Sequence, residues 1–315
     1  MKNFAIMGVA GYIAPRHLKA IKDTGNRLMA AFDPVDSVGI IDSFFPDCHF
    51  FTEFERFDRH VDKCRREDRY HIDYISICSP NYLHDSHIRF ALRIGANAIC
   101  EKPLVLNPWN IDALVDIARE TDRDVNVILQ LRHHESVLKL KEYINSQPDN
   151  KVFDVDLGYV TPRGKWYDVS WKGDTSKSGG IATNIGVHFF DMLIWLFGDV
   201  EESQLHIANC NKSAGYLKLQ RANVRWMLSL DREDVPGYKA GDPPRPYRSI
   251  TVDGKEIDFT HGFTELHTTS YKAIFEGKGY KMEDTRKAIE VVANLRNTLA
   301  TGVNEYSHPL AKPGS

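Results

Sequence analysis

Apolar runs alternate with helical patterns along the first 130 residues. One helical pattern starts at Pro15 and ends at Gly25, and another runs from Pro108 to Ala118, each with proline in the first turn, where it is favoured. The strand-like runs are Phe4–Met7, Arg27–Phe32, Cys48–Phe51, Tyr74–Cys78, Ala98–Cys100 and Val125–Leu129. Strands that alternate with helices in this way predict βαβ units and a parallel, doubly wound sheet.

The pattern changes after residue 131. Apolar and polar residues now alternate in runs broken by Gly, Pro and Asp, at 151–160, 204–211, 215–220, 224–231 and 249–254. This alternation predicts a mostly antiparallel sheet. A last helix is expected from Met282 to Leu299, before a loose polar tail. Since 315 residues suit two cores, we predict an α/β protein with one domain at 1–130 and an α+β domain at 131–315.

A helix that opens at Asn184 carries two stripes. One is apolar and accounts for packing: Ile185, Phe189, Met192 and Leu196. The other has the same spacing and presents polar groups with one indole: Asn184, His188, Asp191 and Trp195. Because packing needs only the first stripe, the second is a candidate for chemistry.

Composition narrows the choice of partner. The net charge is −3 and neither Lys nor Arg forms a tract, so nothing indicates binding to nucleic acid or an anionic membrane surface. The five cysteines are scattered and free of CxxC spacing, which argues against disulfides and a cysteine zinc site and favours the cytoplasm. We expect no cleaved leader and no apolar stretch of membrane-spanning length.

The first strand leads into GVAGYIA, residues 8–14, and then into a helix. Glycines here let backbone N–H groups reach a pyrophosphate, so we expect Gly8, Gly11, Tyr12 and Ile13 to contact a dinucleotide. The loop is one residue longer than the usual G-x-G-x-x-G, and alone it equally suits a plain turn. Asp33 ends the second strand about twenty residues on, where a carboxylate binds ribose hydroxyls. With no Arg or Lys directly after it, NAD is favoured over NADP.

Two further segments follow later strands, at the edge where open α/β sheets bind ligands. In ICSPNYLHDSHI (77–88), the polar side chains are placed either to contact the cofactor or to cap the next helix: Ser79, Asn81 and His84. In ICEKPL (99–104), Glu101 and Lys102 end an inner strand, where charges are costly unless they face a ligand or a partner. Lys102 is a candidate donor to a substrate hydroxyl. Gln130 and Arg132 end the last strand and are placed to reach the nicotinamide or the sugar.

Taken together, SPNYLH (79–84), EKPL (101–104) and GGIATNIGVHFFDMLIWLFG (179–198) resemble the superfamily of glucose-fructose oxidoreductase, inositol dehydrogenase and MocA. The resemblance covers essentially the whole chain. It implies a Rossmann domain, a second domain on a largely antiparallel sheet, and oxidation or reduction of sugar hydroxyls with a nicotinamide cofactor. It also implies a homo-oligomer, either a dimer or a tetramer, formed through the second domain.

By this resemblance Lys102 and His188 flank the reacting carbon. We assign His188 as the base, because an imidazole accepts protons near neutral pH, and Lys102 as the cation that stabilises the alkoxide. A lysine with a depressed pKa would exchange these roles. The superfamily often has an aspartate where this chain has Asn184. An asparagine orients the imidazole or binds substrate, but it supplies no charge.

One branch is more similar still. The segments GVAGYIAPRHLKAIKDTG (8–25), ILQLRHH (128–134) and SWKGDTSKSGGIATNIGVHFFDML (170–193) are similar to bacterial UDP-N-acetylglucosaminuronate dehydrogenases of the WlbA type. That likeness implies oxidation of the sugar 3-hydroxyl in the biosynthesis of diacetamido uronates for surface polysaccharide (lipopolysaccharide, O-antigen). Such a substrate needs cations, and four cluster before the helix: Arg163, Lys165, Lys172 and Lys177. The alternative for each is a solvated loop residue.

Other functions remain open at this stage. A free-sugar or polyol dehydrogenase, or a reductase, would use the same Lys102 and His188, and a non-catalytic NAD-binding sensor would need neither. A metal site is not expected, because His133, His134 and Glu135 are adjacent rather than at a ligand spacing. Whether reduced cofactor leaves or is reoxidised in place by a second substrate such as 2-oxoglutarate is also open.

Overall fold

The computed structural model describes residues 1–243, 245–257 and 262–311. The chain forms two compact units, the first comprising Met1–Gln130 and Phe263–Arg286, the second Leu131–Gly262 and Lys287–Ser315. The first unit ends its long segment at residue 130, where the sequence places a boundary. Residues 263–286, which we expected in the second domain, instead return to the first unit.

The first unit is built on a six-stranded parallel sheet with the strand order β3-β2-β1-β4-β5-β6. Its strands are β1 (Asn3–Met7), β2 (Arg27–Phe32), β3 (His49–Phe51), β4 (Tyr74–Ile77), β5 (Asn97–Cys100) and β6 (Val125–Val127). The prediction of a doubly wound sheet is confirmed, and all six predicted runs coincide with strands to within two residues.

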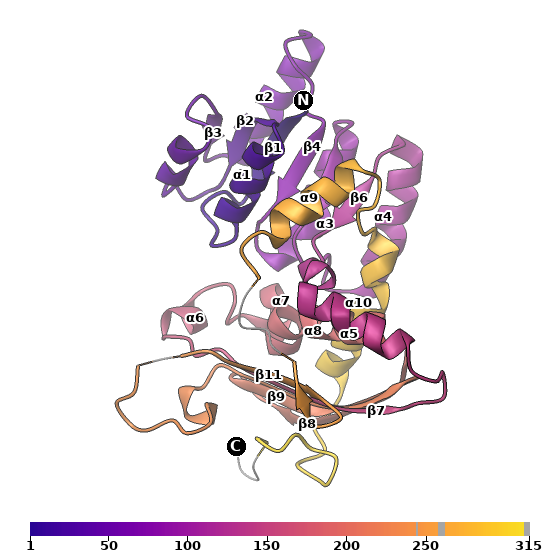
Figure 1. The fold of residues 1–315 in the computed structure, drawn as a ribbon. Helices are drawn as coiled ribbons and strands as arrows, with labels where there is room; N and C mark the ends of the chain where they lie inside the picture. Colours follow the sequence, from indigo (N-terminus) through magenta and orange to yellow (C-terminus); the bar gives the residue numbers. More distant parts are fainter. Residues whose placement is uncertain (244, 258–261, 312–315) are drawn as a thin grey trace. The chain divides into compact units, whose positions relative to one another are not determined.

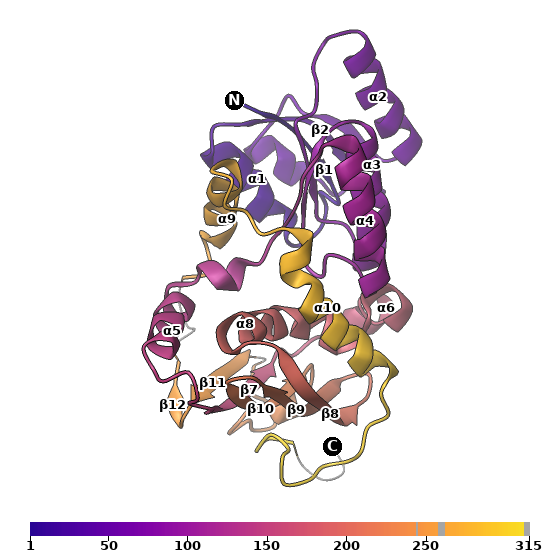
Figure 2. The same ribbon diagram turned by 90° about the vertical axis from the view of Figure 1, so that its right-hand side faces the viewer.

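Helices cover both faces of this sheet. They are α1 (Ala14–Asp23), α2 (Phe54–Arg66), α3 (His84–Arg93), α4 (Pro108–Thr121) and α9 (Leu266–Phe275), with short 3-10 turns at Gly39–Ser43, Asn81–Leu83 and Gln130–His133. Figure 2 shows α1 and α9 on one face and α2, α3 and α4 on the other. Tyr271 and Ile274 of α9 join the buried cluster of Phe4, Ile6 and Leu18. That shared core explains why residues 263–286 return to the first unit.

The second unit carries the other sheet, with the order β12-β11-β7-β10-β9-β8. Its strands are β7 (Phe153–Val160), β8 (Val200–Ala208), β9 (Lys212–Leu219), β10 (Ala222–Ser229), β11 (Tyr247–Val252) and β12 (Lys255–Glu256). Every neighbouring pair is antiparallel except β7 and β10, which are parallel. The prediction of a mostly antiparallel sheet is therefore confirmed.

Helix α8 of the second unit packs on this sheet (Figure 1). The other helices are α5 (Glu135–Asn145), α6 (Trp166–Val169) and α7 (Thr175–Ser178), and α10 (Met282–Asn297) begins in the first unit and ends in the second. Helix α8 spans Val187–Phe197 and is preceded by a π-helical turn at Ala182–Gly186. The Phe190 ring lies 5.1 Å from that of Trp226 on β10, measured between centroids.

The π turn interrupts the regular spacing on which the two predicted stripes depend. Hydrogen bonds in a π-helix span five residues instead of four, so residues before and after residue 186 do not keep α-helical phase. Met192 and Leu196 of the predicted apolar stripe are buried, whereas Ile185 and Phe189 are only half-buried. The predicted stripe is therefore right for the second half of α8, whose buried face also includes Val187, Phe190 and Leu193.

One helical run, Thr175–Phe197, is long and apolar enough by length and composition to cross a membrane. This finding corrects the expectation that no stretch reaches that length. However, 61% of its most apolar window is buried inside the protein, and a core helix passes the same test. We interpret the run as the core helix of the second unit.

The C-terminal segment is more ordered than a loose tail. The Oγ atom of Ser307 lies 2.8 Å from Nδ1 of His206 on β8. Val303 and Leu310 pack against a small apolar cluster that includes Ile207 and Met227. The expectation of a loose tail is thus wrong for residues 303–311, and residues 312–315 lie outside the described part.

Candidate active site

The loop after β1 packs directly on the loop after β4. Gly8 has a φ of +86°, a region that favours glycine, and a Cβ there would lie 2.5 Å from the backbone nitrogen of Ser79. Gly11 donates its N–H to the carbonyl of Gly8 at 3.0 Å and so closes the turn. Within the described residues, the N–H groups of Tyr12 and Ile13 donate to no protein acceptor. They are therefore available to an anion at the start of α1.

Asp33 ends β2 at the same edge of the sheet and is buried. One carboxylate oxygen accepts from Ala10 N–H and the other from Val35 N–H, both at 2.9 Å. The side chain thus holds the glycine loop, and a carboxylate oxygen can accept more than one hydrogen bond, so it can also bind ribose hydroxyls. Pro34 and Val35 follow it, exposed and uncharged.

Gln130 ends the first long segment of this unit. Its Oε1 is buried and has no hydrogen-bond partner in the part of the chain that the structure describes. An orphaned buried acceptor is costly, and a ligand amide such as the nicotinamide carboxamide would satisfy it. The free loop N–H groups, the Asp33 carboxylate and this oxygen together fit a dinucleotide.

The SPNYLH segment joins two loops through hydrogen bonds. The His84 ring lies between two carbonyls, with Nδ1 2.7 Å from the oxygen of Pro103 and Nε2 2.8 Å from that of Ser79. The Ser79 hydroxyl pairs with Nδ1 of His87 at 2.8 Å. Asn81 is buried in the 3-10 turn. The N-cap position of α3 is Leu83, which makes no side-chain cap.

Glu101 follows β5 and is buried between two imidazoles. Its Oε1 accepts from Nε2 of His17 on α1 at 3.0 Å and from Nε2 of His267 on α9 at 2.9 Å. Burial raises the pKa of the Glu101 carboxyl, but the hydrogen bonds from the two histidines outweigh it and hold the pKa well below its usual range. Its other oxygen accepts from the Lys102 backbone N–H at 3.2 Å. The carboxylate is therefore ionised and supports the segment that carries Lys102.

The network extends beyond His17. Its Nδ1 lies 2.8 Å from the Tyr271 hydroxyl, which lies 2.6 Å from Oγ of Ser76. Burial lowers the pKa of His17 and raises that of Tyr271 well above its ordinary value, so both are neutral at pH 7. The three hydrogen bonds then point in one direction. The Ser76 hydroxyl donates to Tyr271, the Tyr271 hydroxyl donates to His17, and His17 donates to Glu101. The sequence does not single out His17, His267 or Tyr271, because residues 84 to 254 positions apart make these contacts.

Among the described residues, His17, Glu101 and His267 form the group that could hold a metal ion, since one ligand atom of each lies within 4.8 Å of the others. Hydrogen bonds already account for their spacing. A metal would have to displace the Nε2 protons that satisfy the Glu101 carboxylate, so we interpret the cluster as a hydrogen-bonded network.

In the second unit, His188 lies half-buried on α8, and Asn184 lies in the π turn before it. Nδ2 of Asn184 donates to the Tyr167 hydroxyl at 3.0 Å. Asp191, on the same predicted stripe, forms a buried bidentate pair with Arg132 at 2.7 and 2.9 Å. Arg132, which the sequence places near the nicotinamide or sugar, is thus engaged in the interior of its own unit. Lys102 and His188 belong to different units.

The four cations in the segment before α8 differ in their exposure and in their partners. Arg163 and Lys165 are exposed, whereas Lys172 is half-buried, and its ammonium lies 4.4 Å from the centroid of the Trp171 ring. Burial, and then the charge of Arg163, lower the pKa of Lys172. Lys177 pairs with Asp174 at 3.4 Å.

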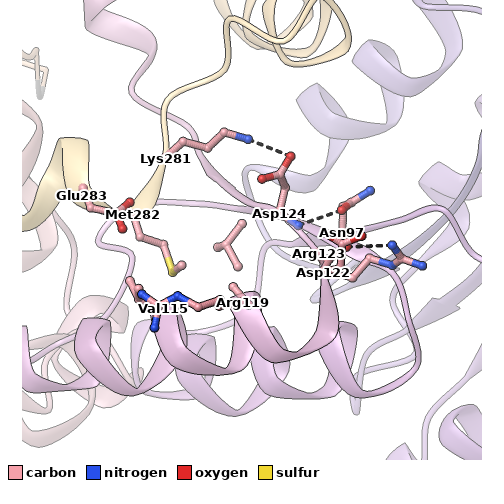
Figure 3. A pocket seen from close by; sticks show the side chains of 11 residues that line it. Asn97, Val115, Arg119, Asp122, Arg123, Asp124, Lys281, Met282 and Glu283 are labelled. Atoms are coloured by element: carbon pink, nitrogen blue, oxygen red, sulfur yellow. Dashed lines mark hydrogen bonds and ion pairs between the residues drawn. The ribbon is translucent and has the colours of Figure 1, made fainter.

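A cavity of about 430 Å³ lies elsewhere in the first unit (Figure 3). It is lined from α4, the starts of β5 and β6, and the start of α10, and its rim carries the ion pair of Lys281 and Asp124 at 2.9 Å. Its lining includes Asn97 and Val125, the first residues of β5 and β6. Because Glu101 and Lys102 follow the opposite end of β5, this cavity is not part of the candidate active site.

Comparison with known sequences gives two matches in chain order. The family described as "Oxidoreductase family, NAD-binding Rossmann fold" matches residues 2–129, and that described as "Oxidoreductase family, C-terminal alpha/beta domain" matches residues 150–235. The first match contains the glycine loop, Asp33, SPNYLH and EKPL. The second contains the π turn and α8.

Two solved structures of a WlbA (WbpB) dehydrogenase from Thermus thermophilus are similar over nearly the full chain. The one in complex with NAD and UDP-GlcNAcA is 48% identical, with a TM-score of 0.93, and the match covers 98% of this chain and 99% of that one. The one with NAD and alpha-ketoglutarate is 49% identical, with a TM-score of 0.94 and the same coverage.

Curated relatives match over shorter stretches. A 2,7-anhydro-N-acetylneuraminate hydratase of Mediterraneibacter gnavus is 26% identical over 205 residues, 64% of this chain and 50% of the relative. A D-glucoside 3-dehydrogenase of Escherichia coli is 29% identical over 131 residues, 40% of this chain and 36% of the relative. The chain therefore spans half or less of the length of these curated relatives. With both domains matched in order, and with the full-length likeness to a dehydrogenase of the same architecture, the chain belongs to the Gfo/Idh/MocA oxidoreductase family.

Proposed function

We propose that the protein oxidises the sugar 3-hydroxyl of UDP-N-acetylglucosaminuronate to a ketone with NAD. The observation that carries this proposal is the 48% identity, over 98% of the chain, to a dehydrogenase whose structure contains NAD and UDP-GlcNAcA. The fit of the glycine loop, Asp33 and Gln130 to a dinucleotide supports the choice of cofactor.

Lys102 and His188 are the proposed catalytic residues. Oxidation of a secondary alcohol removes the hydroxyl proton and a hydride from the same carbon. His188 accepts the hydroxyl proton, while the Lys102 ammonium donates a hydrogen bond to the oxygen as negative charge develops there. NAD, when bound, supplies the acceptor of the hydride. Positioned proton transfer of this kind accelerates the step by about 10²- to 10⁴-fold.

The remaining site residues hold cofactor and substrate. Asn184 orients the His188 imidazole or a substrate hydroxyl, and its bond to Tyr167 fixes its rotamer. Arg163, Lys165 and Lys172 bind the anionic groups of the substrate, which has a carboxylate and a diphosphate. The residues proposed to form the cofactor site are Gly8, Gly11, Tyr12, Ile13, Asp33, Ser79, Asn81, His84, Glu101, Lys102 and Gln130. Of these, Ser79, His84 and Glu101 act through the loops that they brace.

The similar structures also suggest a second substrate. A related dehydrogenase is solved with NAD and alpha-ketoglutarate, so we propose 2-oxoglutarate as a second substrate. Its keto group takes the hydride from NADH and a proton, which gives 2-hydroxyglutarate and regenerates NAD in place. We further propose a cytoplasmic homo-oligomer, a dimer or tetramer, that serves the biosynthesis of surface polysaccharide and binds neither nucleic acid nor membrane.

Absorbance of reduced nicotinamide tests the proposal. Purified protein is mixed with NAD and UDP-N-acetylglucosaminuronate, with and without 2-oxoglutarate, and with free glucuronate and myo-inositol as controls. We expect NADH absorbance to appear with the nucleotide sugar alone, and to fall again, with formation of 2-hydroxyglutarate, when the oxo acid is added. A signal with a free sugar and none with the nucleotide sugar would favour a free-sugar or polyol dehydrogenase. Binding of NAD without any turnover would favour the sensor.

A further inference from the structure

Two cations in the segment before α8 lack a counter-ion. Among the described residues, neither Arg163 nor Lys172 forms an ion pair with a carboxylate. Lys172 is half-buried and feels the positive charge of Arg163, so its charged form is disfavoured by burial and then by repulsion. Two like charges held together without an acid are costly unless an anion binds there. Solvated surface lysines such as Lys139, by contrast, pair with an acid.

An exposed indole lies near one of these cations, Lys172. Trp166 is 55% exposed, and its Cδ1 atom lies 3.2 Å from where a Cβ on Gly164 would be. The glycine therefore leaves room for one edge of the indole beside the backbone. The Lys172 ammonium lies 5.8 Å from the Trp166 ring centroid and 4.4 Å from that of Trp171. Trp171 holds the ammonium, which leaves Trp166 as the accessible ring.

The segment is joined to the proposed catalytic helix. Tyr167, the residue after Trp166, is buried and accepts a hydrogen bond from Asn184 of the π turn. His188 follows Asn184 by four residues. A ligand held by Trp166 and Lys172 therefore lies in the same unit as His188 and is connected to it through one short chain of contacts.

We propose that Trp166, Arg163 and Lys172 form a nucleoside-diphosphate subsite. The nucleobase stacks on the Trp166 indole, and the diphosphate lies between the two cations. Trp171 is a positioning residue that keeps the Lys172 ammonium in place. The inference rests on the proposed function, because it names the part of that site that distinguishes a nucleotide sugar from a free sugar.

The two parts of the subsite predict different ligand dependence. Stacking involves only the base, so Trp166→Ala weakens the binding of uridine, UMP and UDP by the same factor. We expect about tenfold, which is typical of the loss of one base–aromatic contact. The cations contact phosphate only, so Lys172→Met and Arg163→Met weaken the binding of UDP and leave the binding of uridine unchanged. They also reduce the salt dependence of UDP binding. Binding of UDP restores a counter-ion, so Lys172 gains charge and the complex takes up protons at alkaline pH.

Calorimetric titration of the NAD-loaded protein with uridine, UMP and UDP measures these factors. Trp166→Phe keeps a ring and should recover most of the affinity that Trp166→Ala loses, which guards against a folding defect. Matched controls are Trp109→Ala, an indole 64% exposed on α4, and Lys139→Met, an exposed cation paired with Glu135. Neither control should change the affinity for UDP.

The outcomes separate this inference from the proposed function. UDP affinity that depends on Trp166 and Lys172 supports the subsite even if UDP-N-acetylglucosaminuronate is not oxidised. Unchanged UDP affinity in Trp166→Ala overturns the subsite even if the nucleotide sugar is a good substrate. A loss of oligomer in Trp166→Ala with UDP affinity intact also overturns it, because the exposed indole then faces a second copy of the chain.

Discussion

Asp33 illustrates how spacing alone can suggest a role for a residue. Its position at the end of the second strand, about twenty residues after the glycine loop, suggests ribose binding. The structure adds that it also accepts from Ala10 and Val35 N–H. The side chain therefore holds the glycine loop, which the sequence does not reveal, and ribose binding by Asp33 stays a proposal.

Replacing Asp33 by alanine removes a charged acceptor from the ribose and frees two loop N–H groups. Hydrogen bonds to charged groups contribute about 1.5–3 kcal/mol, so we expect NAD to bind about ten- to a hundredfold more weakly. Fluorescence titration with NADH measures the affinity. Asp33→Asn keeps one acceptor oxygen and should lose less. Equal affinity in the wild type and Asp33→Ala would remove Asp33 from the cofactor site.

Glu101 shows where residue-scale reasoning stops. The sequence indicates that a charge at the end of an inner strand needs a ligand or a partner, and His17 and His267 are that partner. Their identity was not predictable, because the first lies 84 residues before Glu101 and the second 166 residues after it. Neither histidine belongs to a recognisable local pattern.

Glu101→Gln tests whether this network supports Lys102. A neutral amide cannot accept from both imidazoles as a carboxylate does, so we expect a loss of about 1–3 kcal/mol in stability and a fall in kcat, with the affinity for NAD nearly kept. Denaturant unfolding and steady-state kinetics provide the two numbers. Glu120→Gln, an exposed change on α4, is the control. A variant with full kcat and reduced stability would mean that the network is only structural.

At the scale of elements, short apolar and β-branched runs predicted all six strands of the first sheet, because buried parallel strands are short and apolar. Periodicity was only partly right at α8, because Met192 and Leu196 are buried as predicted, whereas Ile185 in the π turn and Phe189 are only half-buried. It also could not reveal that α9 returns to the first unit, since an amphipathic helix does not encode which sheet it covers. These failures concern tertiary placement, which local pattern does not determine.

The bond between Tyr167 and Asn184 joins α6 to the π turn. Tyr167→Phe removes the acceptor of the Asn184 amide and leaves the ring, so the fold should be retained. We expect kcat/KM for the nucleotide sugar to fall about tenfold, the effect of one lost hydrogen bond, with NAD affinity unchanged. Steady-state kinetics with thermal melting as a folding check gives the answer. Unaltered kcat/KM would show that α6 does not position Asn184.

For the molecule as a whole, buried histidines make stability depend on pH. Burial, and then the charge of His84, lower the pKa of His87 to about 4, whereas an unfolded histidine titrates near 6.5. Between these values the unfolded chain binds more protons than the folded one, so the free energy of unfolding falls as the pH is lowered. His17 and His84, whose pKa values burial also lowers, act in the same direction.

His87→Gln isolates one of these contributions. An amide does not titrate and can still bond to the Ser79 hydroxyl, so we expect the wild type to lose about 2 kcal/mol more than the variant between pH 7 and pH 5. Denaturant unfolding at the two pH values measures the difference. Parallel losses in the two proteins would show that His87 is protonated in the folded state.

The central claim is that the carbon oxidised is C3 of the nucleotide sugar acid. The most direct measurement is the mass of NADH formed from UDP-N-acetylglucosaminuronate deuterated at C3, with the C4-deuterated compound as the control. The account predicts that NADH carries deuterium only from the C3-labelled substrate, and that His188→Ala abolishes the transfer. Deuterium transfer from C4, or none from either substrate, would contradict it.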